Sequence, residues 1–449
     1  MAARDTRRLT SCPAWQLGTR TIGTAKEFFL QARMHGSMEL LLTFEQIMPA
    51  LFAGYTSMHE GEPFMALGDP VLWRFIQVKT LRHISLFLCF AQSLTWAQNK
   101  TEDRVIRLDG KSARVVVEIG GGAISDFHLV EQKLNPLSWR EPGSAPGLRW
   151  SGHFLCLDRW GPPSEAEERN GMPYHGEVSR VEWQLLQGPD LRNGQIVVDM
   201  NATLPLAGLM VKRQIRMSQS DAFFTVREEV SNTQKLGRIY NIVQHPTIAP
   251  PFLDETTFVD ANGRKGFIAY RPLPNPEEPA VYWPQAFKDG IPVNLRYLTN
   301  DHDPNVVSYT LDDEYGWVTA SNPGKGLLIG YIWKTKDYPW LIDWRDVQNG
   351  RPAARGLEFG TTGLPHPDPI LVAKGKIFGR QLFEHLDAGQ TVAKSYAAFL
   401  LKIPANYKGV SRIDYREGRL VLHERYILYE KDAGPERDLV VEVGVLFPQ

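Results

Sequence analysis

Residues 210–231 read MVKRQIRMS, then QSD, then AFFTVREEVS, and this stretch decides the class of fold. On both sides of Gln219-Ser220-Asp221 the polar residues alternate with apolar ones, as they do in strands that bury one face. A short polar link between two such runs is typical of a hairpin turn. We therefore predict an antiparallel hairpin over these residues.

The same pattern continues outward from this hairpin through the chain after Ala97. Short alternating runs are separated by Gly, Pro, Asn and Asp, and no helix longer than a few turns is needed. No repeat of about 20–50 residues is present, which argues against propellers and solenoids. The fold class we predict is all-β, a large antiparallel β-sandwich with long loops at one edge. Further runs of this kind are Ala113 to Ile119, Val181 to Leu186, Gln195 to Met200 and Leu420 to Tyr429.

The composition favours a neutral small-molecule partner. The 449 residues include 50 Lys and Arg against 51 Asp and Glu, a formal net charge of −1. Such a balance gives no electrostatic reason to expect nucleic acid or an anionic membrane as a partner. The 12 Trp and 15 Tyr supply flat apolar faces of the kind that pack against pyranose rings, although most of them must lie in the core.

The N-terminal part of the chain has the pattern of a signal peptide. In the stretch up to Ala97, basic residues at Arg74, Lys79 and Arg82 lead into the apolar run Ile84 to Leu94, and the small-residue pattern of a cleavage site follows it. A buried amphipathic helix is the alternative, and the run is short for a membrane span. We expect Met65 to be the true start, 65–97 to be a signal peptide and 98–449 to be the secreted or periplasmic domain. No stable membrane insertion is expected after cleavage.

The first 64 residues remain unassigned, since they show no persistent period and no chemical motif. Within them, Met38 to Leu51 is compatible with one short helix. Three cysteines occur in the chain, and cleavage after Ala97 would leave Cys156 alone. An intramolecular disulfide is then impossible, which a domain with a large core can tolerate.

Two glycine-rich segments do not qualify as nucleotide-binding motifs. The run Gly120-Gly121-Gly122 follows a predicted strand, but the next residues continue as strand where a phosphate-binding turn needs a helix. We interpret it as a bulge or a close strand crossing. Gly324-Lys325-Gly326 is a turn between strands. No cofactor is therefore predicted.

Polar groups that could carry chemistry concentrate in four segments. These are residues 152–177, 240–246, 299–305 and 355–363. Their order and spacing resemble the galactose mutarotase (aldose 1-epimerase) family over about residues 113–405: an Arg precedes a His-Gly pair, a second His follows an Asn-containing strand, and a late Glu lies in Gly-Leu-Glu.

The resemblance implies a role for each matching residue. Arg159 corresponds to the substrate-binding Arg, and His175 to the first active-site His of the family. His245 corresponds to its catalytic acid and Glu358 to its catalytic base. The sugar-binding Asp falls on Asp301 or Asp303, of which we take Asp303 as the candidate. His245 departs from the family pattern because Pro246 follows it.

The expected chemistry is opening of a cyclic hemiacetal. A base takes the proton of the anomeric hydroxyl while an acid protonates the ring oxygen, and no metal is needed. From their reference pKa values we expect an ionised Glu358 beside a His245 that this carboxylate keeps protonated. Asp301-His302-Asp303 resembles a metal site, but a solvated turn is the interpretation we prefer. No metal is predicted.

Other interpretations stay open. His245 fits a hydrogen-bonded core residue about as well as a catalyst, and Arg355 could form a local ion pair with Glu358. Residues 338–345, YPWLIDWR, form either a sugar-stacking lip or a buried anchor. The leading function is an isomerase acting on a free sugar or a glycan end, without a sugar phosphate. A non-catalytic carbohydrate-binding module, favoured by Pro246, and a polysaccharide lyase are the alternatives.

Overall fold

The computed structural model describes the backbone of three strands within residues 15–43, and residues 104–143, 150–270, 275–425 and 437–447. The three N-terminal strands form an antiparallel sheet in the order β1 (Trp15–Ile22), β2 (Ala25–Arg33) and β3 (Glu39–Thr43). The short helix suggested from Met38 is wrong, because Glu39–Thr43 is a strand. Met65 and the signal peptide predicted over 65–97 lie outside the described residues.

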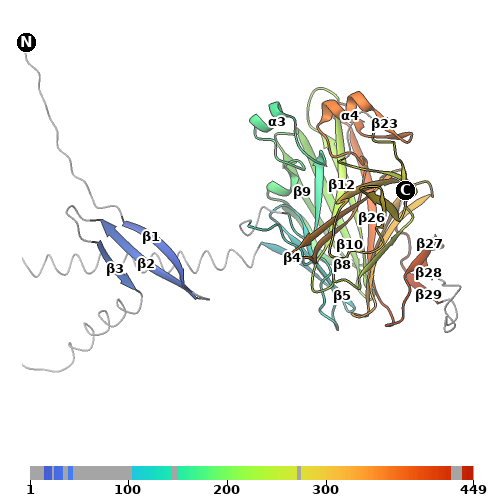
Figure 1. The fold of residues 1–449 in the computed structure, drawn as a ribbon, viewed down its shortest axis with the longest axis horizontal. Helices are drawn as coiled ribbons and strands as arrows, with labels where there is room; N and C mark the ends of the chain where they lie inside the picture. Colours follow the sequence, from blue (N-terminus) through green and yellow to red (C-terminus); the bar gives the residue numbers. More distant parts are fainter. Residues whose placement is uncertain are drawn as a thin grey trace, which may run out of the picture. The chain divides into compact units, whose positions relative to one another are not determined.

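The hairpin that opens the sequence argument is present as two strands of one sheet. Val211 pairs with Val230 and Ile215 with Val226, which confirms the predicted antiparallel register. This sheet has eight strands (Figure 1). In spatial order they are β13 (Phe258–Ala261), β19 (Tyr315–Asn322), β20 (Leu327–Lys334), β26 (Thr391–Lys402), β11 (Phe223–Asn232), β10 (Leu209–Ser218), β9 (Gln195–Leu204) and β8 (Gln184–Arg192).

The second large sheet has eleven strands, all paired antiparallel. Its spatial order is β15 (Val281–Tyr282), β14 (Lys265–Ile268), β18 (Val306–Thr310), β21 (Trp340–Gln348), β22 (Arg351–Gly360), β12 (Arg238–Ile248), β7 (His153–Asp158), β6 (Ile124–Leu129), β5 (Ala113–Glu118) and β4 (Val105–Asp109), with β25 (Glu384–Leu386) paired to β12.

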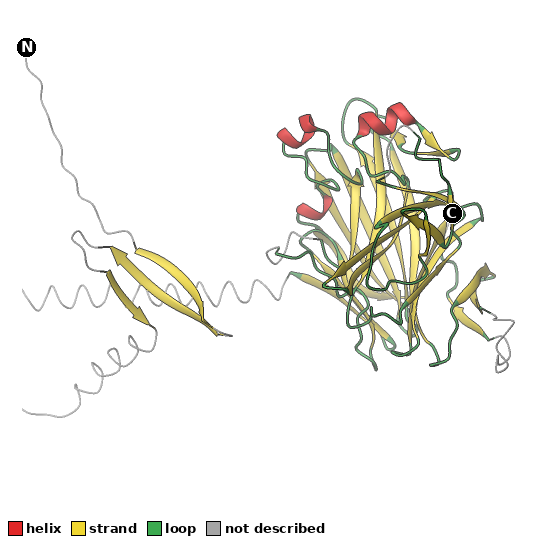
Figure 2. Cartoon of the chain, in the orientation of Figure 1, coloured by secondary structure: helices red, strands yellow, loops and turns green. Residues whose placement is uncertain are grey.

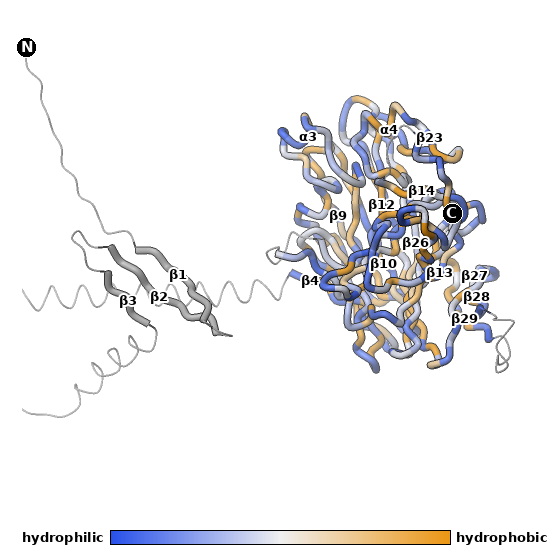
Figure 3. The backbone as a smooth tube through the Cα atoms, in the orientation of Figure 1, coloured by the Kyte–Doolittle hydropathy of each residue, from blue (hydrophilic) through white to orange (hydrophobic). Residues whose placement is uncertain are grey.

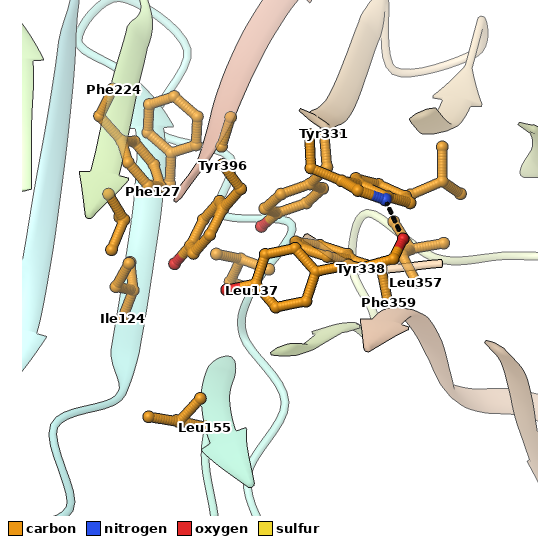
Figure 4. Packing of buried hydrophobic residues seen from close by; sticks show 14 of the residues in the cluster. Ile124, Phe127, Leu137, Leu155, Phe224, Tyr331, Tyr338, Leu357, Phe359 and Tyr396 are labelled. Atoms are coloured by element: carbon orange, nitrogen blue, oxygen red, sulfur yellow. Dashed lines mark hydrogen bonds between the residues drawn. The ribbon is translucent and has the colours of Figure 1, made fainter. Parts of the chain in front are cut away.

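The main hydrophobic core joins side chains of both large sheets. Phe224 of the eight-stranded sheet packs edge-on against Phe127 of the eleven-stranded sheet, with ring centroids 4.9 Å apart. Figure 4 shows this pair near Tyr331, Tyr396 and Phe359, which also come from both sheets. Hydrophilic and hydrophobic stretches are interspersed along the described chain (Figure 3). The predicted all-β antiparallel sandwich is confirmed.

Little of the described chain is helical (Figure 2). The helices are α3 (Glu165–Arg169), α4 (Asp368–Lys374) and the 3-10 turn η1 (Val178–Arg180). No described helix has the length and apolar character that crossing a membrane requires. The smaller sheets pair β16 (Gln285–Lys288) with β17 (Ile291–Asn294), β23 (Lys376–Ile377) with β24 (Arg380–Gln381), and β27 (Val410–Arg416) with β28 (Arg419–Glu424) and β29 (Asp438–Glu442).

The glycine-rich segment after β5, which was interpreted as a bulge or a close strand crossing, is a tight turn that leads directly into β6 and closely approaches residues 179–183. Gly122 has φ of +67°, and a Cβ at this position would lie 2.4 Å from the indole of Trp183. Only glycine fits such a backbone conformation this close to a ring.

Candidate functional site

Three adjacent strands of the eleven-stranded sheet, β7, β12 and β22, place the candidate site on the face that points away from the main core. Along β12, Gln244 faces the main core, so its neighbour His245 faces the opposite side. The register runs from Val243 opposite Gly360 to Thr247 opposite Gly356. His245 is therefore brought level with Glu358 of β22.

His245 and Glu358 are in contact. The Nε2 atom of His245 lies 3.0 Å from Oε1 of Glu358, and the two residues are only 4% and 1% exposed. Despite this contact, neither carboxyl oxygen of Glu358 makes a hydrogen bond that meets the angular criteria within the described residues. On its other side, Nδ1 of His245 lies 3.0 Å from the hydroxyl of Thr247. Phe154 stacks on the imidazole with ring centroids 4.1 Å apart.

The protonation of this pair differs from the sequence prediction. Burial raises the pKa of Glu358 well above its usual range, and the indole of Trp160 opposes this shift only in part. Burial also lowers the pKa of His245 well below its usual range, and His175 adds to that shift. We expected an ionised Glu358 and a protonated His245; loss of hydration disfavours both charges. The arrangement favoured by burial is a protonated carboxyl beside a neutral imidazole.

The pair lies at a cavity of about 300 Å³ with aromatic walls. Trp150 packs nearly parallel to Phe154, with centroids 5.8 Å apart, while Trp139 lies edge-on to Trp344 at 5.9 Å. Among the described residues that line the cavity there is no Lys or Arg. Its aromatic lining is Trp139, Trp150, Phe154, Trp160, Tyr174, Tyr270 and Trp344, and its other polar residues are Glu141, His175 and Asn305.

His175 is held in the cavity wall with a defined tautomer. Its Nδ1 accepts a hydrogen bond of 3.0 Å from the backbone N–H of Gly161. Burial, assisted by the charge of Arg180, lowers the pKa of His175 to about 3, so the ring is neutral at physiological pH. A neutral imidazole that accepts at Nδ1 carries its proton on Nε2. His175 therefore offers a single N–H donor.

Arg159 is not brought to the cavity. Its guanidinium, 2% exposed, donates to Asp158 at 2.6 and 3.0 Å and to Glu167 at 2.8 and 2.9 Å. These carboxylates occupy the guanidinium fork that the predicted sugar contact would need. The position of Arg159 thus fits an anchor for the loop that leads into α3, and does not support the predicted substrate contact.

Asp303 is also placed outside the cavity lining. It is exposed, and its backbone N–H donates to Asp301 at 2.9 Å. Asp301 pairs with Lys288, and Nδ1 of His302 accepts from the backbone of Val347. In the described residues no group of three or more His, Cys, Asp or Glu side chains is arranged to hold a metal.

Two of the open alternatives can now be decided. Arg355 donates to Asp343 on the core side of its strand, at 2.9 and 3.0 Å, and is not the partner of Glu358. In residues 338–345, Tyr338 and Trp340 are fully buried, whereas Trp344 lines the cavity. This segment therefore anchors the strand in the protein interior and also forms part of the cavity wall.

Sequence reasoning did not identify Trp139, Trp150 or Asn305 as site residues. Each of the two tryptophans is next to one end of the bridge between Arg140 and Ser151. Their only sequence signal is a pair of Trp residues in a polar stretch. Asn305 lies two residues beyond Asp303, the candidate taken from the sequence, and belongs to the same polar segment.

Comparison with known proteins gives a similarity in fold. The chain matches no protein-family model and no curated protein. Similar solved structures include a galactose mutarotase related enzyme from Lactobacillus acidophilus, at 12% identity over 67% of this chain and 98% of that chain, with a TM-score of 0.49. Another is a galactose mutarotase-like protein from Lactobacillus casei, at 12% identity over 66% and 100%, with a TM-score of 0.48.

A third similar structure, a galactose mutarotase-like protein from Clostridium acetobutylicum, has 11% identity over 67% and 95% of the two chains and a TM-score of 0.47. The chain is thus similar to proteins of the family that its sequence motifs resemble. At these identities the likeness says nothing about activity, which has to come from the chemistry of the cavity.

Proposed function

We propose that the chain is an isomerase of the aldose 1-epimerase type, which interconverts the anomers of a free sugar or of a glycan end. The observation that carries this proposal is the contact of 3.0 Å between His245 and Glu358 at an aromatic cavity. Two titratable groups that share one proton at a concave site are what hemiacetal opening requires.

The geometry suits this reaction because both reacting oxygens of a cyclic sugar are bonded to the anomeric carbon. One group of the pair donates a proton to the ring oxygen, and the other removes the proton of the anomeric hydroxyl. The bond from the anomeric carbon to the ring oxygen breaks, and the carbonyl forms. After rotation, closure on the other face reverses both transfers and restores the pair.

Burial determines which group donates in the first step. With a protonated Glu358 and a neutral His245 at rest, Glu358 gives its proton to the ring oxygen and His245 takes the hydroxyl proton. These roles are the reverse of those that the sequence resemblance implies. The two arrangements of the pair hold the same number of protons, so a pH–rate profile alone does not distinguish them.

The lining favours a neutral sugar. Aromatic faces pack against the C–H faces of a pyranose, and a cavity lining without Lys or Arg offers a phosphate no partner. His175, with its Nε2–H donor, is a candidate ligand for a sugar hydroxyl. Binding without turnover is the second candidate, which the near-complete burial of both His245 and Glu358 favours.

The test is the rate of anomer interconversion in the full-length protein. Freshly dissolved α-glucose and α-galactose are followed by polarimetry and NMR exchange, with calorimetry reporting binding. Glu358→Gln keeps the shape of the side chain and removes its titratable proton, so the catalysed rate should fall by about 10² or more while binding is retained. His245→Gln should have a similar effect.

A matched control is Glu131→Gln, which removes a carboxylate that is exposed at the surface and pairs with Lys402. It should leave the rate unchanged. Wild-type protein that binds sugar and does not accelerate exchange would establish the binding module instead. In an active protein, a carboxylic acid C=O infrared band that disappears in Glu358→Gln would identify Glu358 as the resting proton donor.

A further inference from the structure

We propose that Arg345 is a positioning residue, which holds the loop of residues 301–305 so that Asn305 meets a sugar hydroxyl in the cavity. This inference rests on the proposed function only in that the cavity binds a sugar. It concerns Asn305, which lines the cavity, and Arg345, which does not.

The side chain of Asn305 is available to a ligand in the cavity. It lines the cavity, is partly buried, and its side-chain amide makes no hydrogen bond to any described residue. An amide offers two N–H donors and a carbonyl acceptor, which match a hydroxyl that both donates and accepts. Asn305 immediately precedes β18, where Val306 pairs with Trp344 of β21.

Arg345 ties this loop to β21. Its Nη2 donates to the carbonyl of Pro304 at 2.6 Å and to that of His302 at 3.3 Å. Its backbone N–H donates to the carbonyl of Asn305 at 2.9 Å. Because strand side chains alternate, Trp344 faces the cavity while Arg345 points to the other side of the sheet.

The buried environment of Arg345 is unfavourable for a charged side chain, and packing alone does not explain why an arginine is present there. The side chain is 1% exposed, and its Nε has no hydrogen-bond partner. Its nearest carboxylate oxygen, Oδ2 of Asp343, is 3.6 Å away, and the other oxygen of Asp343 is bound by Arg355. Replacing buried charges with apolar residues is often neutral or stabilising. What an apolar side chain could not provide here is the pair of hydrogen bonds to the loop carbonyls.

The experiment compares Asn305→Ala, Arg345→Met and the double variant in the full-length protein, with KM and kcat for α-galactose measured by NMR exchange. Asn305→Ala should raise KM about threefold to tenfold, the usual effect of one hydrogen bond, with a smaller change in kcat. Arg345→Met should raise KM in the same way. The KM of the double variant should be no higher than that of the single variant with the higher KM, because both substitutions remove the same interaction with the sugar.

Arg345→Lys retains a donor for one carbonyl and should restore part of the affinity, which a purely structural role would not predict. The matched control is Arg351→Met, at an exposed position on β22, which should leave KM unchanged. If Arg345→Met does not fold, Arg345→Lys takes its place in the double variant, and its smaller rise in KM should likewise not add to that of Asn305→Ala.

Multiplicative effects in the double variant, or an unchanged KM in Arg345→Met, would overturn the inference. If the wild-type protein binds sugar without turnover, the proposed isomerase activity fails, and the same comparison made with calorimetric Kd values still decides the role of Arg345. A wild-type protein that binds no sugar would overturn both.

Discussion

Replacing Arg159 with Ala should destabilise the protein and should have little effect on sugar affinity. The guanidinium makes four hydrogen bonds to Asp158 and Glu167, and Asp158 is fully buried. Removing one member of a buried ion pair costs about 3–5 kcal/mol. Because Asp158 keeps Arg238 as a partner, we expect the free energy of unfolding to fall by the lower value, about 3 kcal/mol. At about 2 °C per kcal/mol for a large domain, Tm should fall by about 6 °C.

The size of this effect should depend on pH. The hydrogen bond from Arg159 lowers the pKa of Glu167 to about 2, against an ordinary value of 4.5. A depressed carboxyl pKa stabilises the fold above the unfolded pKa, and that stability is lost as pH falls through the folded pKa. The difference between wild type and Arg159→Ala should thus be full at pH 7 and shrink below about pH 4.5, although solvent at the partly exposed Glu167 weakens this contribution.

Thermal unfolding followed by circular dichroism, and calorimetry with α-galactose at 25 °C, provide the two readouts. Arg169→Ala is the control, since Arg169 lies in α3 together with Glu167, its side chain is 72% exposed, and it is 3.8 Å from Glu165. Its Tm should not change measurably. An unchanged Tm in Arg159→Ala together with a large loss of sugar affinity would refute the structural role and restore the role implied by the sequence resemblance.

Two further predictions concern pH and the N-terminus. Burial raises the pKa of Asp368 to about 6, so this carboxyl lowers stability as pH rises from about 4 through 6. Asp368→Asn should therefore match wild type at pH 4 in urea unfolding and exceed it at pH 8, by at most ~3 kcal/mol; equal stability at both pH values would contradict this. Export in a bacterial host should yield a chain that begins near Gln98, which N-terminal sequencing checks, and a start before Leu81 would contradict it.

Local sequence predicted the fold class because a strand with one buried face alternates polar and apolar residues whatever its partners are. The hairpin over residues 210–231 is the clearest example. The same information does not specify which distant strands meet. β26 lies between β11 and β20, although it follows β11 by more than 150 residues. Packing of the whole core selects that order, and no local pattern encodes it.

Sequence reasoning could select candidate residues where the chemistry depends on residue type. It could not do so where the role depends on the direction or the burial of a side chain. His245 and Glu358 were selected from their motifs, and the structure brings them into contact at the cavity. Arg159 was assigned to the substrate because spacing does not report where a side chain points; Asp158, with φ of +83°, turns the chain immediately before it. Aromatic residues were equally ambiguous. Trp340 and Trp344 belong to one strand and face the same side, yet one is fully buried and the other lines the cavity.

The charges of the pair illustrate why the surroundings of a site matter as much as its residues. Reference pKa values describe groups in water, whereas Glu358 loses its hydration on burial, which the indole of Trp160 offsets only in part. A group destabilised in this way needs a rigid frame, and β12 supplies one from its other face. There, Gln244 donates to Glu228 of the opposite sheet at 2.6 Å, and Glu228 pairs with Arg213 at 2.7 Å. The strand that carries His245 is thus fixed by a polar link between the two sheets. A shift of the β12 backbone that carried His245 away from Glu358 would strain that buried link, which is a physical reason for the backbone positions of the pair to persist.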